Sequence, residues 1–487
     1  MRNREQGILL HPTSLPGHFG IGTMGAQAFE FIDILAHTHQ TIWQILPLNY
    51  PGYGDSPYSA ISAFAGNSCL INPELLQQDG LLTPLEVETF VLPDSVRVDF
   101  PTVRSNNIRM TQMAWKRFQK GQEYDRFCAD NAYWLNDFSL YIALKQKNNG
   151  VVWTEWKESF SQREELLLKY KHEVEFHTFV QYLFFRQWNA LKRYANSKGI
   201  SIIGDIPIYV AFDSADVWSH SELFRMENGK PEYVAGVPPD YFSEDGQLWG
   251  NPLYRWDVML ENKYEWWYQR LLHAQKQADC IRIDHFIAFT RFWAVLATEE
   301  TAINGNYENG PGTTFFELII SRLPDLKIIA EDLGVITKEV TTLKNQFGFS
   351  GMQVLHFRFW TEPIDFDANT VCYTGTHDND TTLGWYNDIR EQNNETYHAV
   401  NDYFNNGILS SSGEFTCDTN IVPLLIDLAF RSPARKVIIP LQDFLRLGTE
   451  YRMNTPGSAE GNWAWRYLSY QLTEEVQNHI QWLADNY

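Results

Sequence analysis

The feature that most constrains the fold is a series of apolar runs, each as long as a buried strand and most of them followed by a helical pattern. Eight such runs occur, at residues 7–10, 42–46, 200–205, 280–283, 326–331, 353–357, 370–373 and 436–441. Eight strands that alternate with helices, several of them ending in polar residues, predict an α/β fold of the (β/α)8 TIM barrel type. A doubly wound open sheet is the alternative, but it usually carries a glycine-rich phosphate loop after its first strand, which this sequence lacks.

Two connections in this pattern are too long to be simple loops between a strand and a helix. Residues 51–199 form a mostly helical segment, and residues 206–275 form a second segment rich in Pro, Tyr and Trp. They follow strands two and three, at the C-terminal face where barrel enzymes carry their active sites. We therefore expect a single catalytic barrel domain over residues 1–487, with both insertions forming subdomains over that face.

Charge and hydropathy exclude several kinds of partner. The chain has 60 acidic and 39 basic residues, a formal charge of −21, whereas nucleic acids and anionic membranes require a basic surface. No apolar run approaches the roughly 20 residues that span a bilayer. The first residues lead directly into the apolar run at Ile8, which leaves no room for a signal peptide, so a cytoplasmic location is expected.

Composition also bears on ligands. The five cysteines form no CxxC pair, and neither an HExxH motif nor an EF-hand spacing occurs, so we expect no metal and no cofactor. Aromatic residues reach 15%, including 17 Trp and 24 Tyr. Sugar rings present flat C–H faces that stack on aromatic side chains, and their hydroxyls pair with carboxylates, amides and guanidinium groups. The composition is therefore compatible with carbohydrate binding.

Charged side chains gather where the predicted strands end. These residues are Asp205 after strand three, Arg282 and Asp284 on strand four, Glu331 after strand five, and His377 and Asp378 after strand seven. In a barrel, all of them meet at one mouth, where several carboxylates repel one another and do not favour folding. Arg282 and Asp284 by themselves would fit a structural ion pair. The whole group is better explained by acid–base chemistry or metal binding, and the metal-ligand spacings are absent.

The surroundings of each carboxylate suggest a role in glycoside chemistry. Asp284 shares a strand face with Arg282, whose charge should keep it ionised as a nucleophile. Glu331 follows three apolar residues, with Asp332 and other carboxylates near it, so desolvation and like charge should raise its pKa, as a proton donor requires. Asp378 would be a third, ionised carboxylate that holds sugar hydroxyls and a distorted ring; a helix N-cap is the alternative for it.

Four segments resemble the four motif regions of the α-amylase clan, and more narrowly the 4-α-glucanotransferases known as amylomaltase or disproportionating enzyme. These segments are 205–210, 282–286, 331–334 and 376–379. Further matching segments are spread over nearly the whole chain, at 10–16, 54–58, 236–243, 246–252, 452–457 and 462–463. The resemblance implies retaining transfer of α-1,4-glucan segments among maltooligosaccharides and starch- or glycogen-derived glucans, with glucose as an acceptor.

The resemblance also implies roles for individual residues. Asp284 would form the covalent glycosyl-enzyme, Glu331 would be the acid/base, and Asp378 would stabilise the transition state. Residues implied in substrate binding are Arg282 and His377 beside the donor sugar, Asp55, Ser56 and Tyr58 on the donor side, Trp249 and Asn251 on the acceptor side, Asp240 and Tyr241 in a closing loop, and also Asp205 and Asn462.

Two alternatives remain beside transfer. An amylase-like α-1,4-glucan hydrolase would use the same carboxylates and differ only in the acceptor that reaches the intermediate. A non-catalytic glucan-binding protein should have lost a carboxylate, and all three are present. The chain departs from the family pattern at Ile287 and Ala288, where an Arg-Gly pair is usual. This change bears on acceptor-side packing and not on the three carboxylates.

Overall fold

An eight-stranded parallel sheet forms the centre of the molecule. The computed structural model describes residues 4–239, 243–359, 367–404, 417–458 and 460–487. The strands are hydrogen-bonded in the order β11-β8-β3-β2-β1-β14-β13-β12. Their bounds are β1 Glu5–Leu9, β2 Ile42–Gln44, β3 Ser201–Ile206, β8 Cys280–Ile283, β11 Ile328–Ala330, β12 Gly351–Val354, β13 Thr370–Tyr373 and β14 Lys436–Pro440. A parallel bridge between Ile329 and Ser350 brings β11 against the start of β12, so the sheet closes into a barrel.

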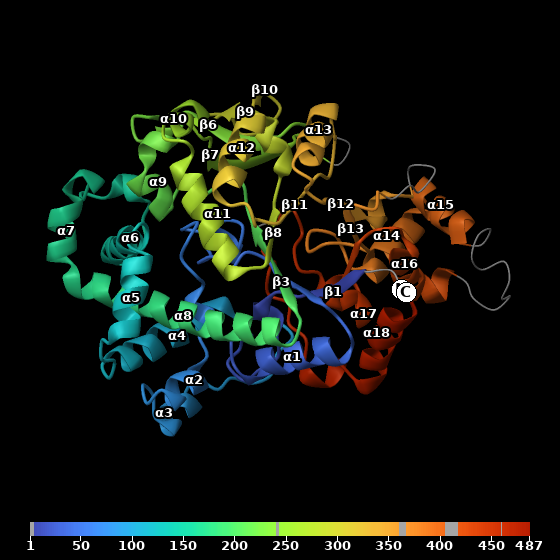
Figure 1. The fold of residues 1–487 in the computed structure, drawn as a ribbon, viewed down its shortest axis with the longest axis horizontal. Coiled ribbons are helices and arrows are strands. Elements are labelled where there is room, and N and C mark those ends of the chain that lie inside the picture. Colours follow the sequence, from blue (N-terminus) through green and yellow to red (C-terminus); the bar gives the residue numbers. More distant parts are fainter. Residues whose placement is uncertain (1–3, 240–242, 360–366, 405–416, 459) are drawn as a thin grey trace.

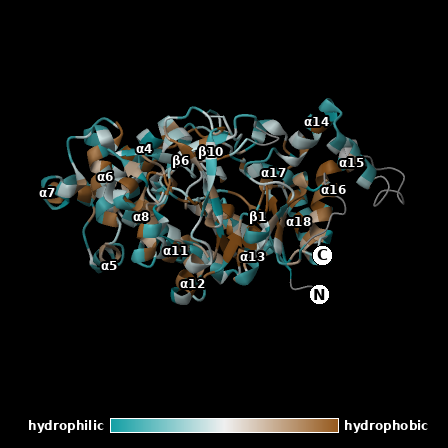
Figure 2. Ribbon diagram, turned by 90° about the horizontal axis from the view of Figure 1, so that it is seen from above, coloured by the Kyte–Doolittle hydropathy of each residue, from teal (hydrophilic) through white to brown (hydrophobic). Residues whose placement is uncertain are grey.

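The predicted (β/α)8 fold is confirmed, and each predicted apolar run overlaps one barrel strand. The runs are apolar along their length and do not alternate because almost every residue in these strands is buried, on both faces of the sheet. Figure 2 shows the apolar residues gathered on the strands around β1, in the middle of the molecule. Gly7 lets β1 and β2 approach closely, since a Cβ there would lie 2.3 Å from the carbonyl oxygen of Ile42.

Helices surround the barrel. Helix α8 packs against α1 and β3, although it lies at the end of the long segment between β2 and β3. The indole nitrogen of Trp188 on α8 donates to the carbonyl of Gln277 (3.0 Å), which ties the barrel's outer layer together. The helices around the sheet are α1 Ala26–His37, α8 Lys171–Ser197, α11 Glu265–Gln277, α12 Gly312–Arg322, α13 Lys338–Gln346, α14 Thr382–Gln392, α15 Glu395–Tyr403, α16 Cys417–Arg431, α17 Leu441–Phe444 and α18 Glu474–Asn486.

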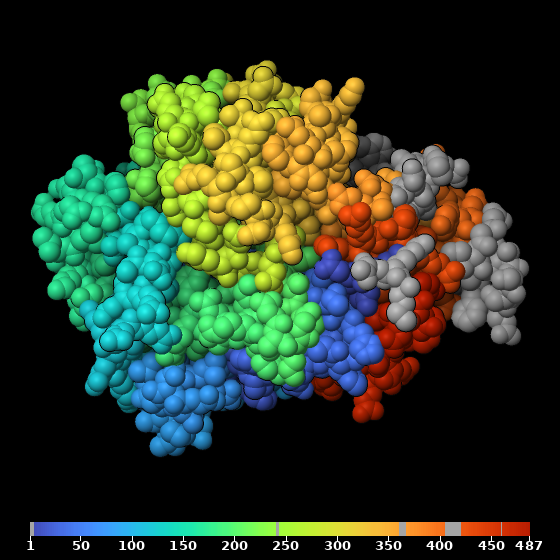
Figure 3. All heavy atoms as spheres, viewed as in Figure 1, coloured from blue at the N-terminus to red at the C-terminus, as the bar shows by residue number. Residues whose placement is uncertain are grey.

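The rest of the segment between β2 and β3 forms a helical body on one side of the barrel. Its helices are α2 Pro73–Gln78, α3 Pro84–Glu88, α4 Phe100–Trp115, α5 Gln122–Asp130, α6 Leu135–Lys147 and α7 Arg163–Lys169. Helices α4, α5, α6 and α7 pack on α8, so α8 belongs to the barrel and to this body at once. The space-filling view shows this body, in blue and teal, continuous with the rest of the molecule (Figure 3).

The segment between β3 and β8 contributes strands that the sequence did not predict. It contains α9 Ala215–Ser219, β4 Met226–Glu227, β5 Lys230–Pro231, β6 Tyr233–Val237, β7 Gln247–Pro252 and α10 Trp256–Glu261. Strands β6 and β7 join β9 Arg291–Leu296 and β10 Gly305–Asn309 in a four-stranded antiparallel sheet, visible above β8 and β11 in Figure 1. None of the helices in the described ranges is long and apolar enough to cross a membrane.

Candidate active site

A buried arginine joins the ends of two barrel strands. Arg282 on β8 is paired in register with Asp205 on β3, and its side chain is only 4% exposed. Its Nη1 lies 2.7 Å from Oδ2 of Asp205, and its Nη2 lies 3.0 Å from Oδ1 of Asp284. The Asp284 side chain is 28% exposed and therefore reachable from the mouth. The predicted contact between Arg282 and Asp284 is confirmed, and it fixes a guanidinium charge beside a solvent-facing carboxylate.

Asp205 forms an ion pair with this arginine inside the barrel and does not face solvent. Its side chain is fully buried, and the hydroxyl of Tyr58 donates to its Oδ2 at 2.8 Å. Burial raises the pKa of Asp205, Arg282 opposes that shift, and Asp284 adds to it. Separating a buried pair of this kind leaves an uncompensated charge, which costs roughly 3–5 kcal/mol. Asp205 thus holds Arg282 in place for Asp284.

Glu331 lies directly after β11 in a different environment. The backbone N–H of His285 donates to its Oε2 at 2.8 Å, and the N–H of Leu333 donates to its Oε1 at 3.0 Å. Burial raises the pKa of Glu331 to about 7, with Asp284 adding to the shift while Arg282 and the two backbone donors oppose it. A carboxyl group with this pKa can hold a proton near neutrality and release it during a reaction.

The predicted influence of Asp332 on Glu331 is wrong. Lys344 forms an ion pair with Asp332 at 2.7 Å, and the backbone N–H of Met352 donates to the other oxygen of Asp332 at 2.7 Å. Asp332 therefore links α13 to β12, and its charge is compensated locally. The like charge that acts on Glu331 comes from Asp284 instead.

Asp378 lies in the loop between β13 and α14 and does not cap the helix. The N-cap of α14 is Thr381, whose hydroxyl accepts the N–H of Gly384. Asn454 donates to Oδ1 of Asp378 at 2.6 Å, and Nε2 of His377 lies 3.3 Å from Oδ2. Burial opposes ionisation, but His377 and the hydrogen bond from Asn454 outweigh it and lower the pKa of Asp378. Asp378 is an ionised carboxylate held from two sides.

Aromatic rings line the same side of the mouth. Tyr58 stacks on His377 with ring centroids 5.0 Å apart and an interplanar angle of 13°. Trp463 lies against both rings, at 5.7 Å from Tyr58 and 5.9 Å from His377. Tyr58 therefore connects the Arg282–Asp205 pair to the histidine beside Asp378.

A buried aspartate just after the last strand holds the loop that carries Asp378. Asp443 on α17 is 1% exposed, and its carboxylate accepts the hydroxyl of Thr374 at 2.5 Å. It also accepts the N–H and the hydroxyl of Thr382, at 2.8 and 2.7 Å. Since the Thr382 hydroxyl donates to Asp443, it accepts from Nε2 of His356, 3.1 Å away. The two ends of the loop, at Thr374 and Thr382, are thereby bound to one carboxylate.

Other predicted binding residues take part in local structure. Asp55 pairs with Arg104 of α4, and the Ser56 hydroxyl accepts the N–H of Tyr58 at 3.2 Å. Asn251 donates to the carbonyl of Val210 at 2.8 Å. These contacts shape the two insertions at the mouth and do not reach the three carboxylates.

Trp249 and Asn462 complete the set that the structure describes. Trp249 is 37% exposed and its ring meets that of His285 edge-on at 4.8 Å, so it borders the site through the residue that binds Glu331. Asn462 bonds to the backbone of Thr455 and Ser458 and closes a loop there. Asp240 and Tyr241 lie outside the described residues.

Four residues at the site were not predicted to have a role. Asn454 binds Asp378, Arg452 donates to the backbone carbonyl of Asp378 at 2.6 Å, Trp463 packs on Tyr58, and Asp443 holds the loop. Three of these residues had a signal in the sequence, because the segments 452–457 and 462–463 resemble the family and contain Arg452, Asn454 and Trp463. Asp443 carried none, because a single aspartate after a strand does not reveal its partners.

The mouth therefore combines a carboxylate paired with arginine, a carboxyl group with a raised pKa and a third carboxylate held by Asn454 and His377. This arrangement is typical of barrel enzymes that cleave glycosidic bonds, in which one carboxyl group donates a proton and a second one is ionised. No group of three or more His, Cys, Asp or Glu suited to a metal ion occurs in the described part of the chain.

Comparison with known proteins agrees with this class. The model of the family described as 4-alpha-glucanotransferase matches residues 10–472. The 4-alpha-glucanotransferase of Synechocystis sp. is 43% identical, covering 99% of this chain and 98% of that protein. The Thermus thermophilus 4-alpha-glucanotransferase is 42% identical with the same coverage. The structure of amylomaltase from Streptococcus agalactiae in complex with acarbose superposes with a TM-score of 0.91 at 34% identity, covering 99% of this chain and 98% of that one.

The chain belongs to the 4-α-glucanotransferase family. It is accordingly a glucan-transferring enzyme, and the amylase-like hydrolase is not favoured.

Proposed function

We propose that this enzyme breaks an α-1,4 bond in a maltooligosaccharide or a starch- or glycogen-derived glucan, keeps the non-reducing part on Asp284, and passes it to the 4-hydroxyl of another glucan or of glucose. The observation that carries the proposal is the contrast between two neighbouring carboxyl groups. Asp284 has the Arg282 guanidinium at 3.0 Å, whereas the pKa of buried Glu331 is raised to about 7.

The reaction divides into two steps. In the first, the Asp284 carboxylate attacks the anomeric carbon while the Glu331 carboxyl donates its proton to the leaving 4-oxygen. In the second, the ionised Glu331 takes the proton of the acceptor hydroxyl, that oxygen attacks the anomeric carbon, and Asp284 leaves as a carboxylate. Two inversions give net retention. Retaining pairs have their carboxyl groups about 5–5.5 Å apart.

Asp378 would bind hydroxyls of the donor sugar. Its carboxylate is fixed by Asn454 and His377, so it can accept hydrogen bonds that strengthen as the ring flattens toward an oxocarbenium ion. Tyr58, beside His377, and Trp249, beside His285, would offer aromatic surface to the donor and acceptor rings. The departure at Ile287 and Ala288 lies in a short 3-10 helix, Phe286–Phe289, packed into the core next to His285.

Incubation with maltotriose tests the reaction class. Transfer yields glucose together with oligomers longer than maltotriose, without a matching gain in reducing ends. Breakdown to glucose and maltose alone, with reducing ends rising, would show hydrolysis and contradict the proposal. Added glucose should raise the yield of short products if glucose is an acceptor, and leave it unchanged if it is not.

A further inference from the structure

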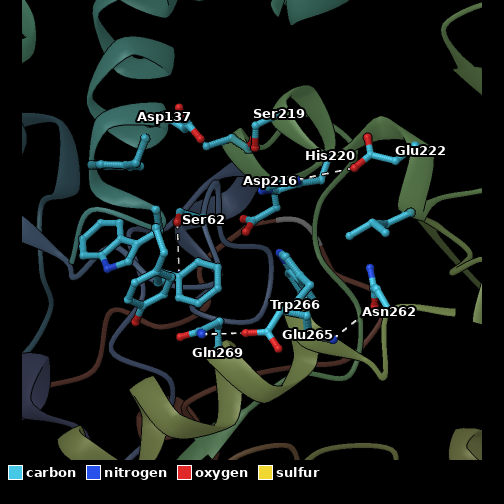
Figure 4. A pocket seen from close by; sticks show the side chains of 16 residues that line it. Ser62, Asp137, Asp216, Ser219, His220, Glu222, Asn262, Glu265, Trp266 and Gln269 are labelled. Carbon is cyan, nitrogen blue, oxygen red and sulfur yellow. Dashed lines mark hydrogen bonds and ion pairs between the residues drawn. The ribbon is translucent and has the colours of Figure 1, made fainter. Parts of the chain in front are cut away.

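A second cavity lies apart from the carboxylates of the mouth. It has a volume of about 270 Å³, near the lower end of the range for small-molecule sites. Its walls come from α6, α9, α11 and the loops around Ser62 and Asn262, where the helical body meets the barrel (Figure 4). Its lining contains none of Asp284, Glu331 and Asp378, nor any residue described above as touching them.

One wall of this side pocket is aromatic. Phe64 stacks on Trp134 at 6.1 Å and meets Trp266 edge-on at 6.0 Å, and Tyr133 lies edge-on to Phe64 at 5.5 Å. Figure 4 shows Trp266 reaching from α11 toward the side that carries Asp216. The indole nitrogen of Trp266 is buried and has no hydrogen-bond partner among the described residues, an unsatisfied donor in the wall.

Carboxylates whose charges are largely compensated also line the pocket. Asp137 pairs with Arg163 at 2.5 Å, and Glu265 pairs with Arg322 at 2.7 Å. Glu222 lies 3.6 Å from His220. These carboxylates keep lone pairs for hydrogen bonds, but they create little net field, so the wall suits hydroxyl donors better than a cation.

Asp216 is the exception among these acids. It is 4% exposed and accepts the backbone N–H of Ala63 at 2.8 Å, but it has no ion-pair partner in the described ranges. Burial raises its pKa. A buried carboxyl of this kind can accept a hydrogen bond from a ligand hydroxyl or donate its own proton to one.

We propose that the side pocket is a second, non-catalytic binding site for a neutral polyhydroxylated ring, namely a glucose unit of an α-glucan. The ring face would lie on the aromatic wall and its hydroxyls would meet Asp216 and the compensated carboxylates. An ammonium ligand is disfavoured, since only Asp216 lacks a cation. The choice of a glucose unit rests on the proposed function; the choice of a neutral polyol rests on the walls alone.

Crystals soaked in maltose give the direct test. Sugar density in the side pocket as well as at the mouth supports the proposal. Density at the mouth alone overturns it and leaves the proposed function intact. Density in the side pocket alone supports this site and contradicts the proposed function, and density at neither place counts against both.

A substitution separates the two sites in solution. Gln269 lines the pocket from α11, and Gln269→Trp would fill it. In an Asp284→Asn background, which should prevent turnover, calorimetric titration with maltose should show two binding events, one of which weakens at least tenfold in Gln269→Trp. Lys276→Trp, at an exposed position of the same helix, is the matched control and should keep both. Equal titrations for the two variants, with unchanged melting temperatures, would overturn the proposal.

Discussion

The barrel mouth and the side pocket both combine carboxylates with aromatic rings, but they distribute positive charge in opposite ways. At the mouth, one buried guanidinium, Arg282, is shared by Asp205 and Asp284, and Glu331 receives only backbone donors. In the side pocket, three of the four acids each have a basic partner of their own, which is an arginine for Asp137 and Glu265 and His220 for Glu222.

This difference in charge pairing suits the mouth to catalysis and the side pocket to binding. At the mouth, burial raises the pKa of Glu331, whereas His377 and the hydrogen bond from Asn454 outweigh burial and lower the pKa of Asp378, so the two values move apart. Acids that each have a basic partner can offer lone pairs to a ligand without taking part in a reaction. The number of carboxylates in a pocket is therefore less informative than the way in which they are paired.

The largest effect should come from removing the carboxylate that pairs with Arg282 at the mouth. Asp284→Asn retains the shape but removes the nucleophile, so we expect kcat for transfer from maltotriose to fall by ~10⁴-fold or more, with binding of maltotriose still measurable. Asp325→Asn, at an exposed position before β11, is the control and should keep parental activity. Turnover within tenfold of the parent in Asp284→Asn would refute the assignment.

Removing the shared cation should weaken both stability and activity. Arg282→Met leaves Asp205 and Asp284 close together without compensation, and we expect unfolding free energy to drop by roughly 3–5 kcal/mol in urea denaturation, with transfer lost. The double variant Arg282→Met/Asp205→Asn should recover part of the stability, because the buried uncompensated charge is gone. If the two variants were equally unstable, the pair with Asp205 would not be the cause.

A smaller effect is expected from the aspartate that binds the loop of Asp378. Asp443→Asn cannot accept all three hydrogen bonds from Thr374 and Thr382, so the loop should shift. Misplacement by ~1 Å can cost up to ~10² in rate, and we expect kcat to fall about 10- to 100-fold with a smaller change in KM. A lower melting temperature with an unchanged kcat would show that Asp443 has a structural role alone.

The smallest and most gradual effect should be the change of kcat/KM with pH. Glu331 must be protonated to donate to the leaving oxygen, and its pKa is raised to about 7. We expect kcat/KM to be halved near pH 7 and to fall about tenfold per pH unit above it. The neutral form is also the one the fold favours, so this group's contribution to stability is full below its unfolded pKa of ~4.3 and is lost as pH rises through about 7.

Glu331→Gln provides the matching control for that profile. Its residual kcat/KM should not fall as the pH rises through 7, because the titrating carboxyl group is gone. Its free energy of unfolding should also vary less between pH 4 and 8 than that of the parent. A parent profile that stays flat up to pH 9 would show that Glu331 is not the group whose proton is transferred.

Much of the site was predictable because it depends on residues close in sequence. Arg282 lies on β8 and Asp284 directly follows that strand, two residues further on, so alternation alone placed them on one face. The apolar residues before Glu331 predicted a buried carboxyl. The prediction failed for Asp332, whose partner Lys344 lies on the following helix, and Asp378 proved not to be an N-cap. The antiparallel sheet of β6, β7, β9 and β10 was missed because its pairings join segments on both sides of β8.

The sequence by itself determined the eight buried strands, the barrel they form and the residues at the strand ends, because burial and alternation are local patterns. Only the tertiary structure decided how the charges at the mouth are paired. Asp205 and Arg282 are 77 residues apart, and Asn454 and Asp378 are 76 residues apart. Such contacts depend on how strands and loops close around the barrel, and the pKa differences that the chemistry needs follow from them.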